Sequence, residues 1–174
     1  DFNGREMIFA ARDRCGSTVD RIRCVRTERF KYIRNSYPEL PYSQFSAYKE
    51  ISYPGMTVAR VMKKKGLLTG PPAVFWESQR PAEELYDLRA DPEELHNLAT
   101  NPHHQQTLTT LREKLNQWIH KTRDRGAESE GDLSELTKQK RAWYTGTMRR
   151  RGLEADASPH EQLKWWEREL GLQD

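Results

Sequence analysis

The sequence predicts an α+β fold, in which a small antiparallel sheet of about four strands is packed by one long amphipathic helix and followed by a helical C-terminal extension. Apolar and polar residues alternate over 20–27 and 29–35, as they do in half-buried strands. Between residues 102 and 125, apolar residues recur at three- and four-residue spacing, which indicates a helix. A polar break at 127–131 then separates this region from further helical patterns.

The first three strands are predicted from their residue patterns. Residues 5–11 form an apolar run typical of a buried strand. Residues 20–27 place Asp20, Ile22 and Cys24 on one side and Arg21, Arg23 and Val25 on the other. Residues 29–35 alternate more regularly. Turn residues at 16–18 and the short connection 27–29 join these segments as an antiparallel meander.

A fourth strand is predicted at Leu85–Leu88, followed by the turn pair Asp91-Pro92. Glu94 lies three residues after Asp91, where the partner of a capping box belongs. The pattern therefore predicts a capped entry toward the long helix directly after this strand.

The long helix is predicted to begin at Asn101-Pro102 and to end near Gly126. Its apolar stripe should lie across the sheet. The stripe consists of Leu108, Leu111, Leu115, Trp118 and Ile119. Truncation of Trp118 to Ala is expected to cost about 3–5 kcal/mol if that side chain is buried.

Proline and tyrosine predict loops over 36–54 and 70–81, with a short helix over 56–65 that Gly66 ends. After the linker at 127–131, residues 132–150 are predicted to form a polar helix.

A last helix should begin at Ser158-Pro159, with Glu161 completing a capping box. The predicted domains are residues 1–126 and a helical extension of unknown role over 127–174.

The composition of the chain bears on whether nucleic acids or membranes are among its partners. The chain has 174 residues, a formal net charge of +3, and a mean hydropathy of -0.99. Its 29 basic and 26 acidic residues are too balanced to indicate a nucleic-acid partner. No apolar run reaches the ~18 residues that a membrane span needs. The prediction is therefore no nucleic acid and no membrane among its partners.

The two cysteines, Cys15 and Cys24, fit no zinc or CxxC spacing. They flank a predicted turn between two strands. Two free thiols are the favoured interpretation, and a cross-strand disulfide in an oxidising compartment is the alternative.

Several motifs resemble the closing segment of sulfatases of the alkaline phosphatase superfamily, and their heparan N-sulfatase-like branch in particular. The segment 84–99 follows the pattern ELYDL-x-x-DP-x-E-x-x-NLA. Residues 10–14, 20–27 and 29–35 together resemble an AVRT-x-R-YKYIRN hairpin. Residues 111–124 resemble the last helix of that family. The resemblance covers about residues 5–126, and phosphonate hydrolases and phosphodiesterases of the superfamily share related segments.

The resemblance implies that this is the C-terminal subdomain of a hydrolase that cleaves sulfate esters or N-sulfates. Its partners would then be the N-terminal catalytic domain of the same polypeptide and a sulfated substrate such as a sulfated glycan. The parent enzyme would use calcium and a formylglycine made from a cysteine. Secreted, periplasmic and lysosomal locations all stay open for such a parent.

The motif that would carry this chemistry is missing from the chain. The family forms its formylglycine within Cys-x-Pro/Ser-x-Arg, but Cys15 and Cys24 both lack the arginine at the fourth following position. No Asp-Asp or Asp-Asn pair supplies oxygen ligands for calcium. We therefore predict no catalytic residue and no metal ligand here, and whether the chain is an enzyme on its own stays open.

Arg12, Asp13 and Arg14 form the cluster that we predict to lie near a substrate. They follow the first strand, at a predicted hairpin tip, and guanidinium groups bind sulfate and carboxylate through paired donors. In the resembled family this loop approaches the mouth of the active site. The plainer interpretation is a solvated loop with a local Arg–Asp pair.

Two basic runs, 63–65 and 149–151, are predicted mainly to complement helix ends, although either suits an anionic glycan. The histidines do not show the spacing of a metal site. For Trp143, Trp165 and Trp166, packing is the favoured interpretation, and stacking on sugar rings is the alternative. The alternative function is a free-standing interaction module that binds anionic polysaccharide through Arg12, Arg14 and the basic runs.

Overall fold

The computed structural model describes residues 4–15, 18–128, 131 and 133–172. These residues form two compact units. The first unit is made from 4–14, 19–40 and 78–128, and the second from 15, 18, 41–77, 131 and 133–172. The chain changes from the first unit to the second close to the predicted domain boundary, which itself stays a prediction.

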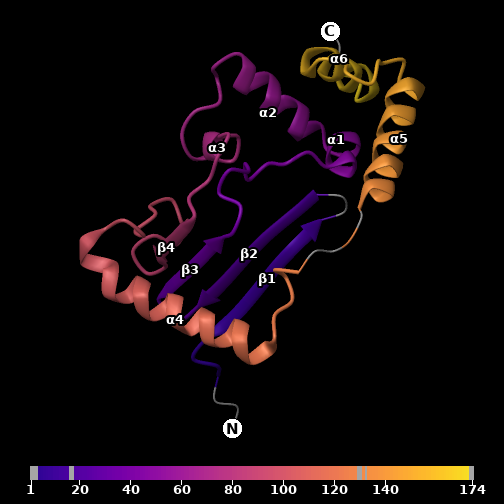
Figure 1. Cartoon of the computed structure of the whole chain (residues 1–174). Coiled ribbons are helices and arrows are strands. Elements are labelled where there is room, and N and C mark those ends of the chain that lie inside the picture. Colours follow the sequence, from indigo (N-terminus) through magenta and orange to yellow (C-terminus); the bar gives the residue numbers. More distant parts are fainter. Residues whose placement is uncertain (1–3, 16–17, 129–130, 132, 173–174) are drawn as a thin grey trace. The chain divides into compact units, whose positions relative to one another are not determined.

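The first unit contains an antiparallel sheet of four strands in the order β1-β2-β3-β4 (Figure 1). The strands are β1 (Ile8–Cys15), β2 (Thr18–Arg26), β3 (Phe30–Asn35) and β4 (Glu83–Asp87). This confirms the α+β class and the predicted meander. The amide of Thr27 donates to the carbonyl of Phe30 at 2.8 Å, which closes the predicted β2–β3 hairpin.

The register of the strands assembles the core of this unit. Val25 lies opposite Tyr32, and Tyr32 lies opposite Leu85, so one residue from each of three strands meets in a row. All three are fully buried. Because side chains alternate across a strand, this row defines the face of the sheet that the long helix must cover.

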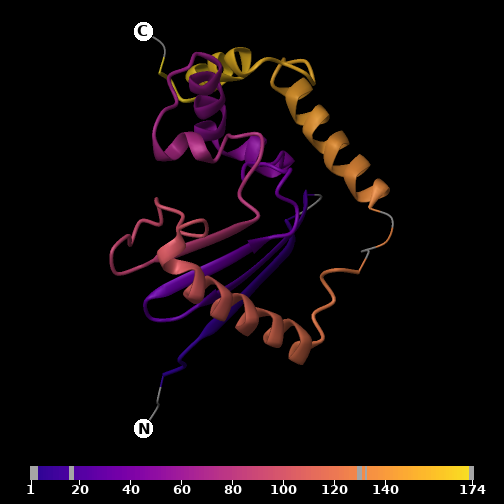
Figure 2. The same ribbon diagram turned by 60° about the vertical axis from the view of Figure 1, so that its left-hand side comes forward.

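Helix α4 (Gln105–Thr122) lies across that face, as both ribbon views show (Figures 1 and 2). Leu108, Leu111 and Leu115 complete the core cluster with the three strand residues. Burial of each leucine contributes roughly 1.5–3 kcal/mol. Trp118 is only partly buried and stacks on Phe9 with ring centroids 5.2 Å apart, so the predicted apolar stripe is confirmed.

The predicted capping box at Asp91 is wrong. Asp91 accepts hydrogen bonds from the amides of Leu95 and His96 at 3.1 and 2.8 Å, and residues 91–98 contain a turn and a bend but no helix. Glu94 has a φ of 55° and binds Lys31 instead, with 2.6 Å between the charged atoms. A tertiary ion pair therefore replaces the local cap.

The long helix begins later than this motif. The side chain of Asn101 accepts from the amide of His103 at 2.9 Å and starts a short 3-10 turn, η1 (Pro102–His104), which leads into α4. The start at Asn101-Pro102 is thus confirmed. At the other end Arg123 adopts a left-handed conformation, and the helix ends at Thr122 instead of near Gly126.

Asn97 closes the outer edge of β4. Its side-chain oxygen accepts from the amide of Leu85, and its side-chain nitrogen donates to the carbonyl of Glu83, both at 3.0 Å. The amide of Leu98 adds a bond to the carbonyl of Leu85 at 2.8 Å. An exposed edge would leave these groups unpaired, so Asn97 substitutes for a neighbouring strand.

The second unit is helical. Its elements are α1 (Ala47–Ser52), α2 (Pro54–Lys64), α3 (Pro71–Val74), α5 (Ser134–Arg150) and α6 (Pro159–Glu169). Helices α1 and α3 lie where loops are predicted, because each is too short to show a clear periodicity. Gly66 ends the α2 region with a φ of 69°, as predicted.

Contacts of α1 with α2 and α5, and of α2 with α6, hold the second unit together. Ala47, Val61 and Met148 are its buried apolar residues. The predicted capping box of α6 is confirmed, since the amide of Ser158 donates to Glu161 at 2.7 Å and the amide of Glu161 donates back at 3.3 Å.

Candidate functional site

Arg12, Asp13 and Arg14 lie within β1 and not at a hairpin tip beyond it. The strand continues to Cys15, four residues beyond its predicted end at residue 11, so the predicted placement is wrong. Arg12 and Arg14 are exposed on one face of the strand, and Asp13 is half-buried on the other. The two exposed guanidinium groups remain the predicted substrate contacts, whereas the carboxylate has a partner inside the fold.

That partner is Arg23 of β2, whose side chain is only 1% exposed. Its Nη1 lies 2.7 Å from Asp13 and its Nη2 lies 2.7 Å from Asp124, which follows α4. Its Nε also donates to Asp124, and Nη1 donates to the carbonyl of Ile22 at 2.9 Å. One buried guanidinium therefore links β1, β2 and the end of the long helix.

Gly126 makes room for this arginine. A Cβ at residue 126 would lie 1.8 Å from Nη2 of Arg23 and 2.5 Å from the carboxylate of Asp13. The amide of Gly126 also donates to Asp124 at 2.8 Å. A larger residue at position 126 would therefore have to displace the side chains of Arg23 and Asp13 from their present contact.

The charge balance around Arg23 is reflected in the pKa values. The hydrogen bonds that Arg23 donates to Asp124 hold the pKa of Asp124 down at about 2 and raise the pKa of Arg23. Both groups are ionised at neutral pH. Sequence reasoning missed this pair, although Arg23 on the same strand face as Val25 was the available signal.

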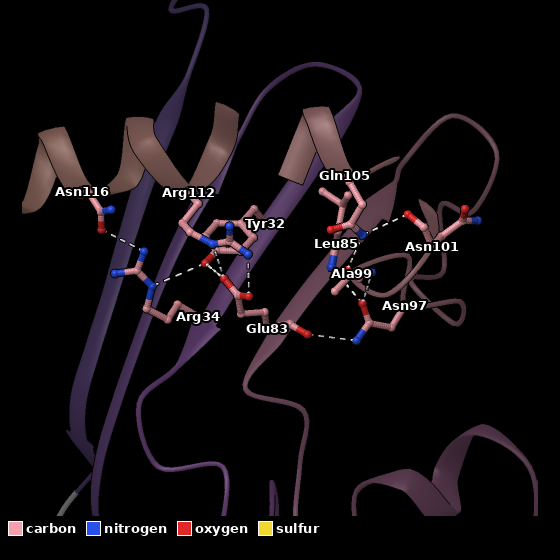
Figure 3. A network of polar contacts seen from close by, with 10 residues as sticks. All are labelled: Tyr32, Arg34, Glu83, Leu85, Asn97, Ala99, Asn101, Gln105, Arg112 and Asn116. Atoms are coloured by element: carbon pink, nitrogen blue, oxygen red, sulfur yellow. Dashed lines mark hydrogen bonds and ion pairs between the residues drawn. The ribbon is translucent and has the colours of Figure 1, made fainter. Parts of the chain in front are cut away.

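A second network joins the sheet to α4 (Figure 3). Arg112 of the helix forms a bidentate ion pair with Glu83 of β4, with both nitrogen–oxygen distances at 2.8 Å. The hydroxyl of Tyr32 donates to the same carboxylate, and Arg34 donates to Asn116 at 2.8 Å. Arg112 lowers the pKa of Glu83, and burial raises the pKa of Tyr32.

The sheet also buries polar side chains away from the α4 core cluster. Arg80 and Asp20 form an ion pair in which both side chains are 0% exposed. Glu84 accepts from Asn35 and from the hydroxyl of Tyr86, each at 2.6 Å. The carboxylates of Asp20 and Glu84 thus bind an arginine, a side-chain amide and a hydroxyl within the protein. Such contacts stabilise the fold.

The two cysteines are free thiols, as the favoured interpretation predicts. Cys15 is exposed and Cys24 is half-buried, and burial raises the pKa of the Cys24 thiol. Over the described residues, no three His, Cys, Asp or Glu side chains converge as metal ligands. The described side chains therefore do not fit a calcium centre, and neither cysteine lies in the formylglycine motif.

The basic runs occupy different settings. Lys63 and Lys64 lie in the last turn of α2, exposed, as predicted for residues that complement a helix end. Arg151 donates to the carbonyl of Ile51 at 2.6 Å and stacks over Trp165, with its guanidinium carbon 3.8 Å from the ring centre.

Trp165 and Trp166 thus serve packing in the second unit, as interpreted from the sequence, while Trp143 is 40% exposed. In the described part of the chain, no helix combines the length and the apolar character that crossing a bilayer requires.

Comparison with known proteins connects this scaffold to sulfatases. An ulvan-active sulfatase of Formosa agariphila is 40% identical over 115 residues, which are 66% of this chain and 19% of that protein. The chain thus spans about a fifth of the length of this curated relative. No protein-family model matches the chain. The 40% identity supports a relationship to sulfatases.

Two solved structures are also similar. A presumed sulfatase of Bacteroides thetaiotaomicron aligns with 76% of this chain and 20% of its own, at 19% identity and a TM-score of 0.45. A 2-O GAG sulfatase aligns with 75% of this chain and 19% of its own, at 18% identity and a TM-score of 0.43.

Proposed function

We propose that this chain is the C-terminal subdomain of a longer sulfatase of the alkaline phosphatase superfamily, of the heparan N-sulfatase-like branch. The parent hydrolyses sulfate esters or N-sulfates of a sulfated glycan, and its calcium and formylglycine belong to a catalytic domain elsewhere in the polypeptide. This piece buttresses that domain and shapes the substrate pocket. The observation that carries the proposal is the 40% identity to a sulfatase of which the chain covers 19%.

The internal contacts support the buttressing part of the proposal. Arg23, Arg80 and Arg112 are each committed to a carboxylate of the same unit, so they stabilise a scaffold instead of offering reactive groups. Asn97 gives the asparagine of the resembled closing motif a structural role at the edge of β4. A rigid scaffold of this kind is what holds recognition side chains in place.

The reading frame that precedes this segment in its gene tests the class of the parent. A Cys-x-Pro/Ser-x-Arg motif there, with an early Asp-Asp pair, is the expected result. A preceding frame with neither motif would contradict the sulfatase proposal and favour a free-standing interaction module, or a phosphodiesterase or phosphonate hydrolase relative.

Arg12 and Arg14 provide a kinetic test of the pocket-shaping role. In the longer polypeptide, the double variant R12Q/R14Q is expected to raise KM for the sulfated glycan about tenfold with kcat unchanged, because both guanidinium groups bind substrate and transition state alike. Lys114, which is exposed on α4, supplies the control K114Q. An unchanged KM in R12Q/R14Q would remove these arginines from the substrate site.

A further inference from the structure

A groove of about 780 Å³ opens at one end of the sheet, beside the β2–β3 hairpin. The approach to β1 forms part of its lining, and the turn after β4 contributes Arg89. Its charged lining consists of Arg5, Arg26, Arg29, Arg89, Glu6 and Glu28. Among the described residues, four guanidinium groups and two carboxylates thus line one concave surface.

Arg29 is held in place before any ligand arrives. Its Nε and Nη2 donate to Asp87 at 3.0 and 2.7 Å, and Asp87 is only 7% exposed. The guanidinium carbon also lies 4.8 Å from the centre of the Phe30 ring. Nevertheless 52% of the arginine side chain is exposed, so a fixed cationic group still faces solvent.

The other arginines of the groove are less constrained. Arg89 pairs with Glu28, but the two side chains are 63% and 85% exposed, and such surface pairs contribute little. Arg5 and Arg26 are exposed, and in the described part of the chain no salt bridge is formed by either. An anion in the groove therefore displaces no buried contact.

We propose that this groove binds the sulfate groups of an anionic polysaccharide. The fork of guanidinium donors matches the paired oxygens of a sulfate, and several arginines around one concavity match a chain that carries repeated sulfates. None of the described lining residues is aromatic, so these residues offer no stacking surface of the kind that single-stranded nucleic acids use. The choice of a sulfated ligand rests on the proposed function.

The test compares affinities of the full chain for fluorescent dextran sulfate across a salt titration. The variant R5Q/R26Q removes two groove charges and no buried contact. We expect the variant to bind about tenfold more weakly. Because two charge-assisted contacts are lost, the slope of log Kd against log salt concentration should also decrease by about two. The matched control K63Q/K64Q removes the same charge from α2 and is expected to bind like the wild type.

Thermal unfolding of both variants shows whether the fold is intact, and uncharged dextran and a thymidine oligonucleotide serve as competitor ligands. The proposal is overturned if dextran sulfate fails to bind, if R5Q/R26Q binds as tightly as K63Q/K64Q, or if the oligonucleotide binds equally well. Failure of the groove to bind dextran sulfate would contradict the groove proposal alone. The proposed sulfatase function of the parent is tested separately, by sulfate release from the longer polypeptide.

Discussion

The arginines of the first unit fall into two groups that differ in their partners. Arg23 and Arg80 are at most 1% exposed, and their donors are taken up by the carboxylates of Asp13, Asp124 and Asp20. The groove arginines are exposed, and among the described residues only Arg29 has a buried carboxylate partner. The same side chain thus stabilises the fold in one place and is available to an anionic ligand in another.

The buried group connects segments that are far apart in the chain. Arg23 joins β2 to residue 124, and Arg80 joins residue 20. The partly exposed Arg112 joins α4 to β4 in the same way. A buried charge that loses its partner is costly, since it can neither return to water nor find a new counter-ion. Substitution within this group should therefore weaken folding, whereas substitution in the groove should weaken binding.

Arg23→Met has the largest expected effect. It leaves Asp124 without its counter-ion and removes a donor from Asp13, so the free energy of unfolding should fall by about 3–5 kcal/mol. Urea denaturation followed by circular dichroism measures this. Arg26→Met is the matched control on the same strand, and because Arg26 is exposed its effect should stay within about 0.5 kcal/mol. Equal losses of stability in the two variants would contradict the distinction between the buried arginines and the groove arginines.

The ion pair of Asp124 should make the free energy of unfolding depend on pH. Its pKa falls from 3.8 to about 2 on folding, so its ion pair stabilises the protein fully above pH 4 and is lost as the pH falls toward 2. Asp124→Asn should therefore be less stable than the wild type by about 2 kcal/mol at pH 7. Urea denaturation at pH 7, 4, 3 and 2 should show this difference shrinking to nearly zero. A difference that stays constant with pH would contradict the ion pair.

Glu83→Gln has the smallest expected effect, because Glu83 and Arg112 are 30% and 37% exposed. Loss of the charged partner should cost about 1 kcal/mol in the free energy of unfolding. Glu113→Gln on the exposed face of α4 is the control. A loss as large as that from Arg23→Met would show that partial exposure does not weaken these ion pairs.

The local patterns of the sequence predicted most of the fold of the first unit. Alternation located β2 and β3, and the leucine stripe located α4, because both depend only on periodicities of two and about 3.6 residues. The start at Asn101, the end at Gly66 and the capping box at Ser158 were found for the same reason, since caps are local in sequence.

Contacts between distant residues lay beyond these patterns. Asp91 and Glu94 have the spacing of a capping box, but Lys31, distant in sequence, binds Glu94 and the chain turns instead. The sequence places Arg23 on the same strand face as Val25, but no local pattern identifies its partner Asp124, which lies 101 residues away in the chain. The arginines of the groove come from three separate segments, so no single stretch of the sequence predicts the groove.

The resembled motifs also gain a physical reading from the structure. The asparagine of the closing phrase pairs with the β4 edge. The helix motif supplies Leu111 and Leu115 to the core, and its Asp124 forms the ion pair with Arg23. These are requirements of a scaffold.

Release of inorganic sulfate from a sulfated glycan tests the central claim most directly. The assay compares this 174-residue chain with a longer polypeptide that includes the sequence encoded before it. The account predicts release by the longer polypeptide and none above background by the chain alone. Release by the isolated chain, at a rate that scales with its concentration, would show that the reacting groups lie within these residues.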